Sequence, residues 1–149
     1  MKKLRLTLLT AAIFTTLLVF QNCGDKKKDE EPRQLTINIL KSKTWEVSSV
    51  VVPANTATEA ADWVNFKVAF SETTMTTSGH ATGSTAVWPS GSYTVSEDGK
   101  SITREDGVVM QLNPLTETNF TARFTVPDGT DIGGGRIAAL EGEYTFNMQ

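Results

Sequence analysis

Residues 120–126 read FTARFTV and residues 140–148 read LEGEYTFNM, and these two stretches decide the fold. In both, apolar residues or Gly occupy every second position, while polar or charged residues fill the positions between. Successive side chains of a strand point to opposite faces of a sheet, so this period of two indicates strands with one buried face. The Gly-rich segment at 127–136 reads as a long loop between them.

The same alternation extends back through the chain and is interrupted by turn signals. Asp98-Gly99 and Asp106-Gly107 are typical of tight hairpins, and Ser71-Glu72 also predicts a tight turn. Asn113-Pro114 is expected to end a strand, because Pro cannot donate to a ladder. Residues 35–41 are expected to form a short helix or an irregular lead-in. The eight predicted strands cover residues 45–52, 64–70, 73–78, 93–95, 101–104, 108–112, 120–126 and 140–148.

The lengths of the connections predict how these strands are arranged. If each strand pairs with the next, the three long connections at 53–63, 79–91 and 127–137 lie at one end, and tight turns lie at the other. We therefore predict an all-β domain, an eight-stranded antiparallel up-and-down barrel whose looser end can hold a small ligand. The alternative is an immunoglobulin-like β-sandwich.

The domain resembles the lipocalin-like families. The resemblance rests on Trp45 at the start of the first strand, on the eight-strand meander and on GEYTF at 142–146. The Gly-x-Trp signature of lipocalins reads Lys43-Thr44-Trp45 here, so the glycine is missing. The likeness implies an Arg stacked over the Trp, and either Arg123 or Arg136 fits that position.

The N-terminus has the layout of a secretory signal peptide. Lys2, Lys3 and Arg5 form a positive region, and the apolar run at 6–20 is fifteen residues long, short of the ~20 that span a bilayer. A retained signal-anchor is the alternative. We assign residues 1–22 to the signal peptide, 23–32 to a lipidated Cys with a charged tether, and 33–149 to one all-β domain.

Cys23 is the only cysteine, so an internal disulfide is excluded. Phe20-Gln21-Asn22-Cys23 resembles the lipobox of bacterial lipoproteins, although small residues are commoner before the Cys. The resemblance implies lipidation of Cys23 and anchoring in the outer membrane after export. KKKDEEP at 26–32 resembles the Lys-then-acidic signals that send some lipoproteins to the cell surface.

Composition narrows the function classes. Residues 33–149 carry eight basic against thirteen acidic residues, and this net charge of −5 argues against nucleic acid. His80 is the only histidine and has no sequence signature of a nucleophile–base pair or a metal site around it. We expect no enzyme activity, no metal and no cofactor.

Trp63, His80, Trp88 and Arg136 fall in or beside the long connections, and we predict that they form a ligand-binding rim opposite the Asp98-Gly99 turn. The alternative for each Trp is that it fills the core beneath its loop. Two functions follow: a lipoprotein that binds a small apolar molecule, a glycan or a partner protein, or a structural accessory subunit of an outer-membrane complex. A hollow barrel favours the first, and a filled barrel with an exposed apolar face favours the second.

The anchor gives the first testable prediction. Intact-mass analysis of the protein from a lipoprotein-processing bacterium is expected to show cleavage before Cys23 and added acyl mass, because a lone Cys directly after a signal-peptide-like segment is the expected site of lipid attachment. Cys23→Ser is expected to leave an unlipidated or unprocessed precursor. Recovery of the wild-type chain with Met1 retained would contradict the assignment.

Overall fold

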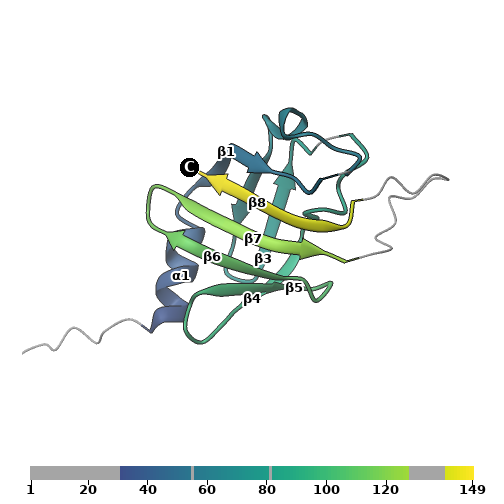
Figure 1. Ribbon diagram of the computed structural model, residues 1–149. Coiled ribbons are helices and arrows are strands. Elements are labelled where there is room, and N and C mark those ends of the chain that lie inside the picture. Colours follow the sequence, from purple (N-terminus) through teal and green to yellow (C-terminus); the bar gives the residue numbers. More distant parts are fainter. Residues whose placement is uncertain (1–30, 55, 81, 128–139) are drawn as a thin grey trace, which may run out of the picture. The chain divides into compact units, whose positions relative to one another are not determined.

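The computed structural model describes residues 31–54, 56–80, 82–127 and 140–149 (Figure 1). Within these residues, each strand pairs antiparallel with the next, and β8 pairs with β1 to close a barrel. This confirms the predicted up-and-down barrel over the sandwich. The strands are β1 (Thr44–Val51), β2 (Lys67–Phe70), β3 (Thr74–Ser78), β4 (Gly91–Val95), β5 (Ser101–Arg104), β6 (Val109–Leu115), β7 (Phe120–Val126) and β8 (Gly142–Met148).

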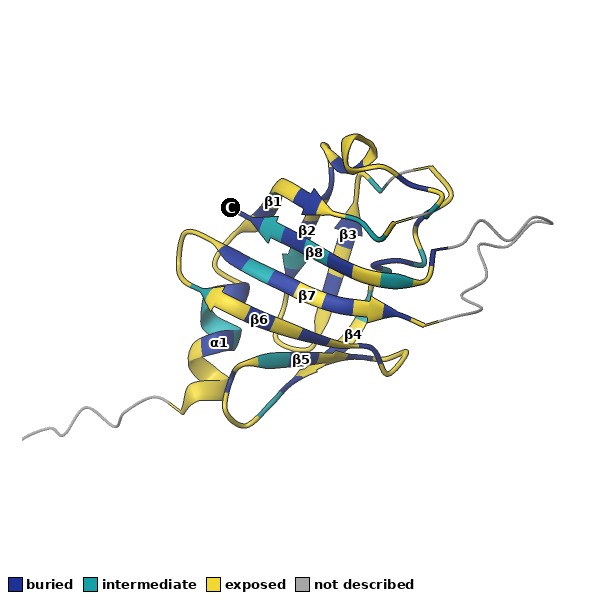
Figure 2. Cartoon of the chain, in the orientation of Figure 1, coloured by how far each residue is buried: buried dark blue, intermediate teal, exposed yellow. Residues whose placement is uncertain are grey.

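The predicted inward and outward faces are confirmed at most positions, with Val64 as an exception. Phe66, Phe124 and Phe146 are buried, whereas Lys67 and Arg123 are exposed. Along β7, buried residues alternate with more exposed ones (Figure 2). The β7–β8 pairing holds this register over seven consecutive residue pairs, so a slip by one residue would turn every apolar side chain of these strands outward.

A short helix, α1 (Pro32–Leu40), packs at the end of the barrel that carries the tight turns, called here the short-turn end (Figure 1). The buried Thr36 hydroxyl donates a hydrogen bond of 2.8 Å to the carbonyl oxygen of Gly99. The indole N–H of Trp45 donates one of 2.7 Å to the carbonyl oxygen of Leu40. Among the described residues, no helix has both the length and the apolar character needed to cross a bilayer.

The Asp98-Gly99 turn forms as predicted, and its glycine is required for two reasons. Gly99 has a φ of +70°, and a Cβ at this position would lie 2.6 Å from the carbonyl oxygen of Pro32. Any side chain would therefore strain the turn and push α1 away from the barrel.

The predicted strand at 64–70 is too long at its start, because β2 begins only at Lys67. A 3-10 helix, η1 (Ala60–Trp63), precedes β2 and leaves Val64 69% exposed. The Asp62 carboxylate accepts a hydrogen bond of 2.8 Å from the backbone N–H of Glu59, which caps this turn. The turn directs Trp63 into the barrel and consequently Val64 outward.

The expectation that Asn113-Pro114 ends its strand is wrong. β6 continues to Leu115, with a shift of register against β7 between Leu112 and Leu115. An irregularity of this kind accommodates Pro within a strand, because the residues at the shift do not all need to donate to the ladder.

The expected Arg over Trp45 is replaced by a lysine. Lys43 Nζ lies 4.4 Å from the centroid of the Trp45 ring. Arg123 instead faces outward and pairs with Glu143, and Arg136 lies outside the described residues. Lys43 is only two residues before Trp45, so its ammonium group reaches the indole ring from the start of the same strand. A cation from a distant strand is not needed.

Candidate functional site at the long-loop end

The end of the barrel opposite α1, called here the long-loop end, is filled by aromatic rings. Neighbouring rings in this cluster have centroids 5.1 to 6.5 Å apart, mostly in edge-on or tilted arrangements. The cluster comprises Trp63, Phe66, Trp88, Phe124, Tyr144 and Phe146, and none of them is more than 3% exposed. Phe124, Tyr144 and Phe146 lie on strands, and Phe66 directly precedes β2. The two tryptophans come from the connections.

The ring cluster leaves no space for a ligand at this end of the barrel interior. Trp63, Phe66 and Trp88 have no accessible surface, and their ring centroids lie 5.1 to 5.2 Å from that of Phe146, so the rings themselves occupy this part of the interior. Among the described residues, the rings therefore fill the part of the interior in which we expected a ligand, and ligand binding itself stays a prediction. The alternative considered for each Trp, that it fills the core beneath its loop, describes the structure.

The β3–β4 connection at 79–90 is held in place by specific hydrogen bonds. His80 Nε2–H donates to the carbonyl oxygen of Trp88 at 2.8 Å, and the imidazole ring lies 5.3 Å from the ring of Phe66. The indole N–H of Trp88 points to Met75 Sδ at 3.3 Å. Gly79 starts the connection with a φ of +68°, and a Cβ there would lie 2.0 Å from the carbonyl oxygen of Asn65.

The structure brings three of the four predicted site residues together. Trp63, His80 and Trp88 lie at the long-loop end, and the His80 ring centroid is 6.3 Å from that of Trp63. Arg136 lies outside the described residues. Their role in binding stays a prediction, and only His80, which is half-buried, shows part of its side chain to solvent.

The prediction missed a buried cation, Arg104, on the inner face of β5. Its guanidinium is 2% exposed and donates through Nε to Asp106 Oδ1 at 3.1 Å and through Nη2 to Asp106 Oδ2. Nη1 donates to the carbonyl oxygen of Val87 at 2.7 Å, and Cζ lies 5.6 Å from the Phe124 ring centroid. Arg104 therefore ties the Trp88 connection to the β5–β6 turn. The sequence feature that could have revealed it is its position two residues after Ile102, because side chains two apart on a strand share one face.

The Asp106 carboxylate remains ionised beside this arginine. Burial acts to raise its pKa, but the hydrogen bonds from Arg104 and from the Val108 N–H, together with the positive charge of Arg104, lower the pKa below the ordinary 3.8. The pair is therefore charged at neutral pH, and its net charge is zero.

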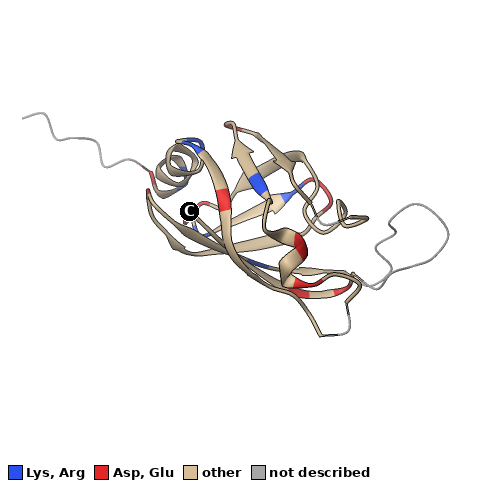
Figure 3. Ribbon diagram, turned by 90° about the horizontal axis from the view of Figure 1, so that it is seen from above, with Lys and Arg blue, Asp and Glu red and all other residues tan. Residues whose placement is uncertain are grey.

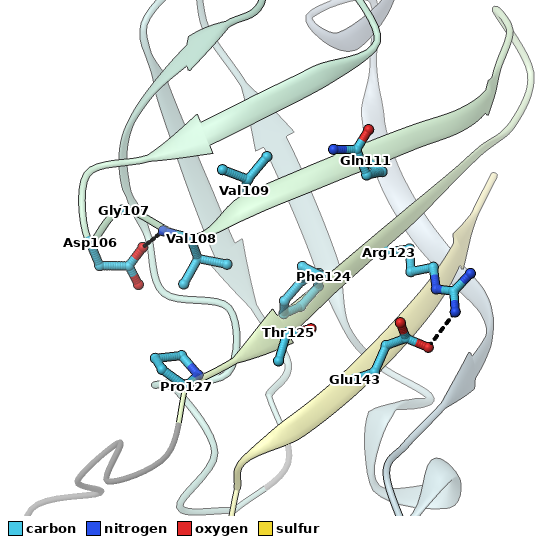
Figure 4. Close-up of a pocket in the computed structure, with 10 residues that line it drawn as sticks. All are labelled: Asp106, Gly107, Val108, Val109, Gln111, Arg123, Phe124, Thr125, Pro127 and Glu143. Carbon is cyan, nitrogen blue, oxygen red and sulfur yellow. Dashed lines mark hydrogen bonds and ion pairs between the residues drawn. The ribbon is translucent and has the colours of Figure 1, made fainter.

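A groove of about 780 Å³ opens on the outer surface beside this pair (Figure 4). The groove forms where β6 and β7 separate. The pairing of these two strands begins at Gln111–Arg123, and the next outward residues, Val109 and Thr125, are not paired with each other. Figure 4 shows the two strands diverging towards Asp106 and Pro127. The lining residues are Asp106, Gly107, Val108, Val109, Gln111, Arg123, Phe124, Thr125, Pro127 and Glu143.

Opposite charges meet on one wall of the groove. Arg123 Nη2 donates to Glu143 Oε1 at 2.6 Å across β7 and β8, and both side chains are more than half exposed. The hydrogen bond from Arg123 lowers the pKa of Glu143, and that same bond raises the pKa of Arg123. Charged residues are otherwise spread over the described strands and turns, without a continuous basic stripe (Figure 3).

The chain matches no protein-family model, and no curated protein is significantly similar to it. Among the described residues, no three His, Cys, Asp or Glu side chains gather closely enough to hold a metal ion. Three features define this end of the described barrel: an interior filled by rings, the buried Arg104 paired with the partly exposed Asp106, and an external groove.

The Arg104–Asp106 pair gives a prediction about stability. Asp106→Asn is expected to lower the free energy of unfolding by about 2–3 kcal/mol at pH 7, because it leaves a buried guanidinium without its counter-charge. The folded pKa of Asp106 lies below the ordinary 3.8, so its contribution is present above that value and is lost as the pH falls through the lower folded pKa. Denaturant unfolding at several pH values measures both effects.

Asp98→Asn is the matched control, because Asp98 also precedes a turn glycine but is fully exposed and faces no buried cation. The double variant Arg104→Met, Asp106→Asn is expected to regain part of the loss, since no unpaired charge remains in the barrel. An Asp106→Asn protein as stable as the Asp98→Asn protein would show that the ion pair does not secure this end.

Proposed function

We propose that the protein is an exported lipoprotein, anchored through lipid on Cys23, and that its barrel is a binding module for a partner protein. The anchor is supported by the sequence: a positive start, a short apolar run, a lone Cys and a charged tether. The described domain begins at Glu31, beside the short-turn end. A tether attached there leaves the long-loop end opposite the point of attachment.

One observation supports recognition on the outside of the barrel. The interior at the long-loop end is filled by rings without accessible surface, whereas the outer face at that same end carries the groove of about 780 Å³. A hollow of this size on an otherwise convex barrel is a common form of binding site. The binding surface is accordingly the groove, and the interior serves as its rigid support.

The chemistry of the groove favours a polypeptide over the other predicted ligands. Its only aromatic residue, Phe124, is 3% exposed, so no ring is available to stack on a sugar. Acidic and basic side chains line the groove, together with the amide of Gln111 and the hydroxyl of Thr125. Val109, which is 47% exposed, adds an apolar contact. Such a mixture of polar rim and small apolar contact is typical of protein interfaces.

The second candidate, an accessory subunit of an outer-membrane complex, is favoured by two features of the structure. The barrel is filled, as expected of a structural component, and Val51 and Val64 are 61% and 69% exposed on the outside. Exposed apolar side chains of this size fit a permanent protein contact when they form part of a larger patch.

Site-specific photocrosslinking in the native host tests the proposed function. A benzophenone side chain at Val109, in the groove, is expected to give a discrete crosslinked partner, whereas the same group at Thr94, on the outer face of β4, is expected to give none. Arg123→Glu is expected to reduce the yield at Val109, because it reverses one charge in the groove.

Equal crosslinking from both positions, or none from Val109, would contradict recognition in the groove. A partner that instead remains bound in fixed stoichiometry through detergent purification, and that is insensitive to Arg123→Glu, would support the accessory subunit.

A further inference from the structure

A second hollow lies between β1 and η1, away from the groove. It forms because β1 and β2 pair only over three residue pairs, up to Glu46–Lys67. Beyond this point β1 shifts register against β8 between Val47 and Ser49, and η1 covers the gap. The pocket has a volume of about 130 Å³, and it is lined by Val47, Ser48, Ser49, Val50, Ala60, Trp63 and Val64.

Trp63, one of the residues that line this pocket, has an unusual polar group. Its Nε1–H is buried and has no hydrogen-bond partner, and it is the one buried side-chain polar atom in this state among the described residues. The other two indoles are engaged: Trp45 donates to Leu40 and Trp88 points to Met75 Sδ. A buried indole N–H normally finds an acceptor, so this orphaned donor requires an explanation.

The two serines that line the pocket are hydrogen-bonded to Asn147. Ser48 Oγ donates to the carbonyl oxygen of Asn147 at 3.0 Å, and Ser49 Oγ accepts from Asn147 Nδ2 at 2.9 Å. The remaining lining residues are Val, Ala and Trp, and none of the lining residues is charged. An ionised ligand would lose its hydration there without gaining a partner. The pocket therefore suits an uncharged, largely apolar molecule.

We propose that this pocket binds a small, uncharged, apolar molecule with one hydrogen-bond acceptor, such as a ketone or ester oxygen, which accepts the N–H of Trp63. The volume is close to the ~150 Å³ of an apolar cavity that takes up benzene. Nε1 has almost no accessible surface, so the acceptor reaches it when η1 shifts outward. η1 is a four-residue 3-10 helix, and Ala60, Ala61 and Asp62 are exposed on it. The inference does not depend on the groove.

Two probes of the same shape test the proposal by following the indole N–H resonances of the purified protein by NMR. Cyclopentanone carries the acceptor, and methylenecyclopentane replaces its oxygen with CH₂. Saturable binding of cyclopentanone is expected to move the Trp63 resonance downfield and to leave those of Trp45 and Trp88 in place. Its affinity is expected to be about tenfold higher than that of the hydrocarbon, as one added hydrogen bond implies.

Matched variants in η1 locate the site, and one variant of Trp63 itself tests the hydrogen bond. Ala60→Leu is expected to fill the pocket and abolish binding, whereas Ala61→Leu, on the next residue of η1 but outside the lining, is expected to leave it unchanged. Trp63→Phe is expected to remove the preference for the ketone. A non-saturable response of Trp63, equal affinities for the two probes, or equal effects of Ala60→Leu and Ala61→Leu would overturn the proposal.

Discussion

The packing of Trp88 inside the barrel is the contact on which the long-loop end depends. Its ring lies 5.2 to 5.5 Å from those of Phe66, which directly precedes β2, and of Phe124 and Phe146, which lie on the paired strands β7 and β8. The carbonyl oxygen of Trp88 accepts a hydrogen bond from His80, and that of the preceding Val87 accepts one from Arg104. A loop residue thus takes the place that a ligand occupies in a hollow barrel.

This arrangement follows from how the strands separate at the long-loop end. The ladders between β1 and β2 and between β3 and β4 are short. The ladder between β6 and β7 stops before it reaches the long-loop end. Two of these openings are covered by inserted connections, which bring Trp63 and Trp88 into the barrel. The opening between β6 and β7 remains as the external groove. The same loosened pairing therefore accounts for both the filled interior and the outer hollows.

Most of the strands could be predicted from the sequence, because alternation is a local signal, and the lengths of the connections indicated the up-and-down barrel. Phe120 to Val126 and the Asp98-Gly99 turn needed no knowledge of distant residues. The site depended on long-range contacts that no local pattern carries. Arg104 sits on an inward position because Val87, seventeen residues earlier, offers it a carbonyl. Loop length placed Trp63 and Trp88 at the correct end, but the direction of their rings depended on how the connections fold inward.

The central claim is that the β3–β4 connection is a fixed part of the core and not a lid over a ligand cavity. Hydrogen exchange of the Trp88 indole N–H, measured by NMR, tests this claim most directly, because the N–H is buried against Met75 Sδ and exchanges only when the loop opens. If the loop is part of the core, the free energy of opening at Trp88 equals the global free energy of unfolding from denaturant titration. An opening free energy well below the global value would show that the loop opens while the barrel stays folded, and would contradict the account.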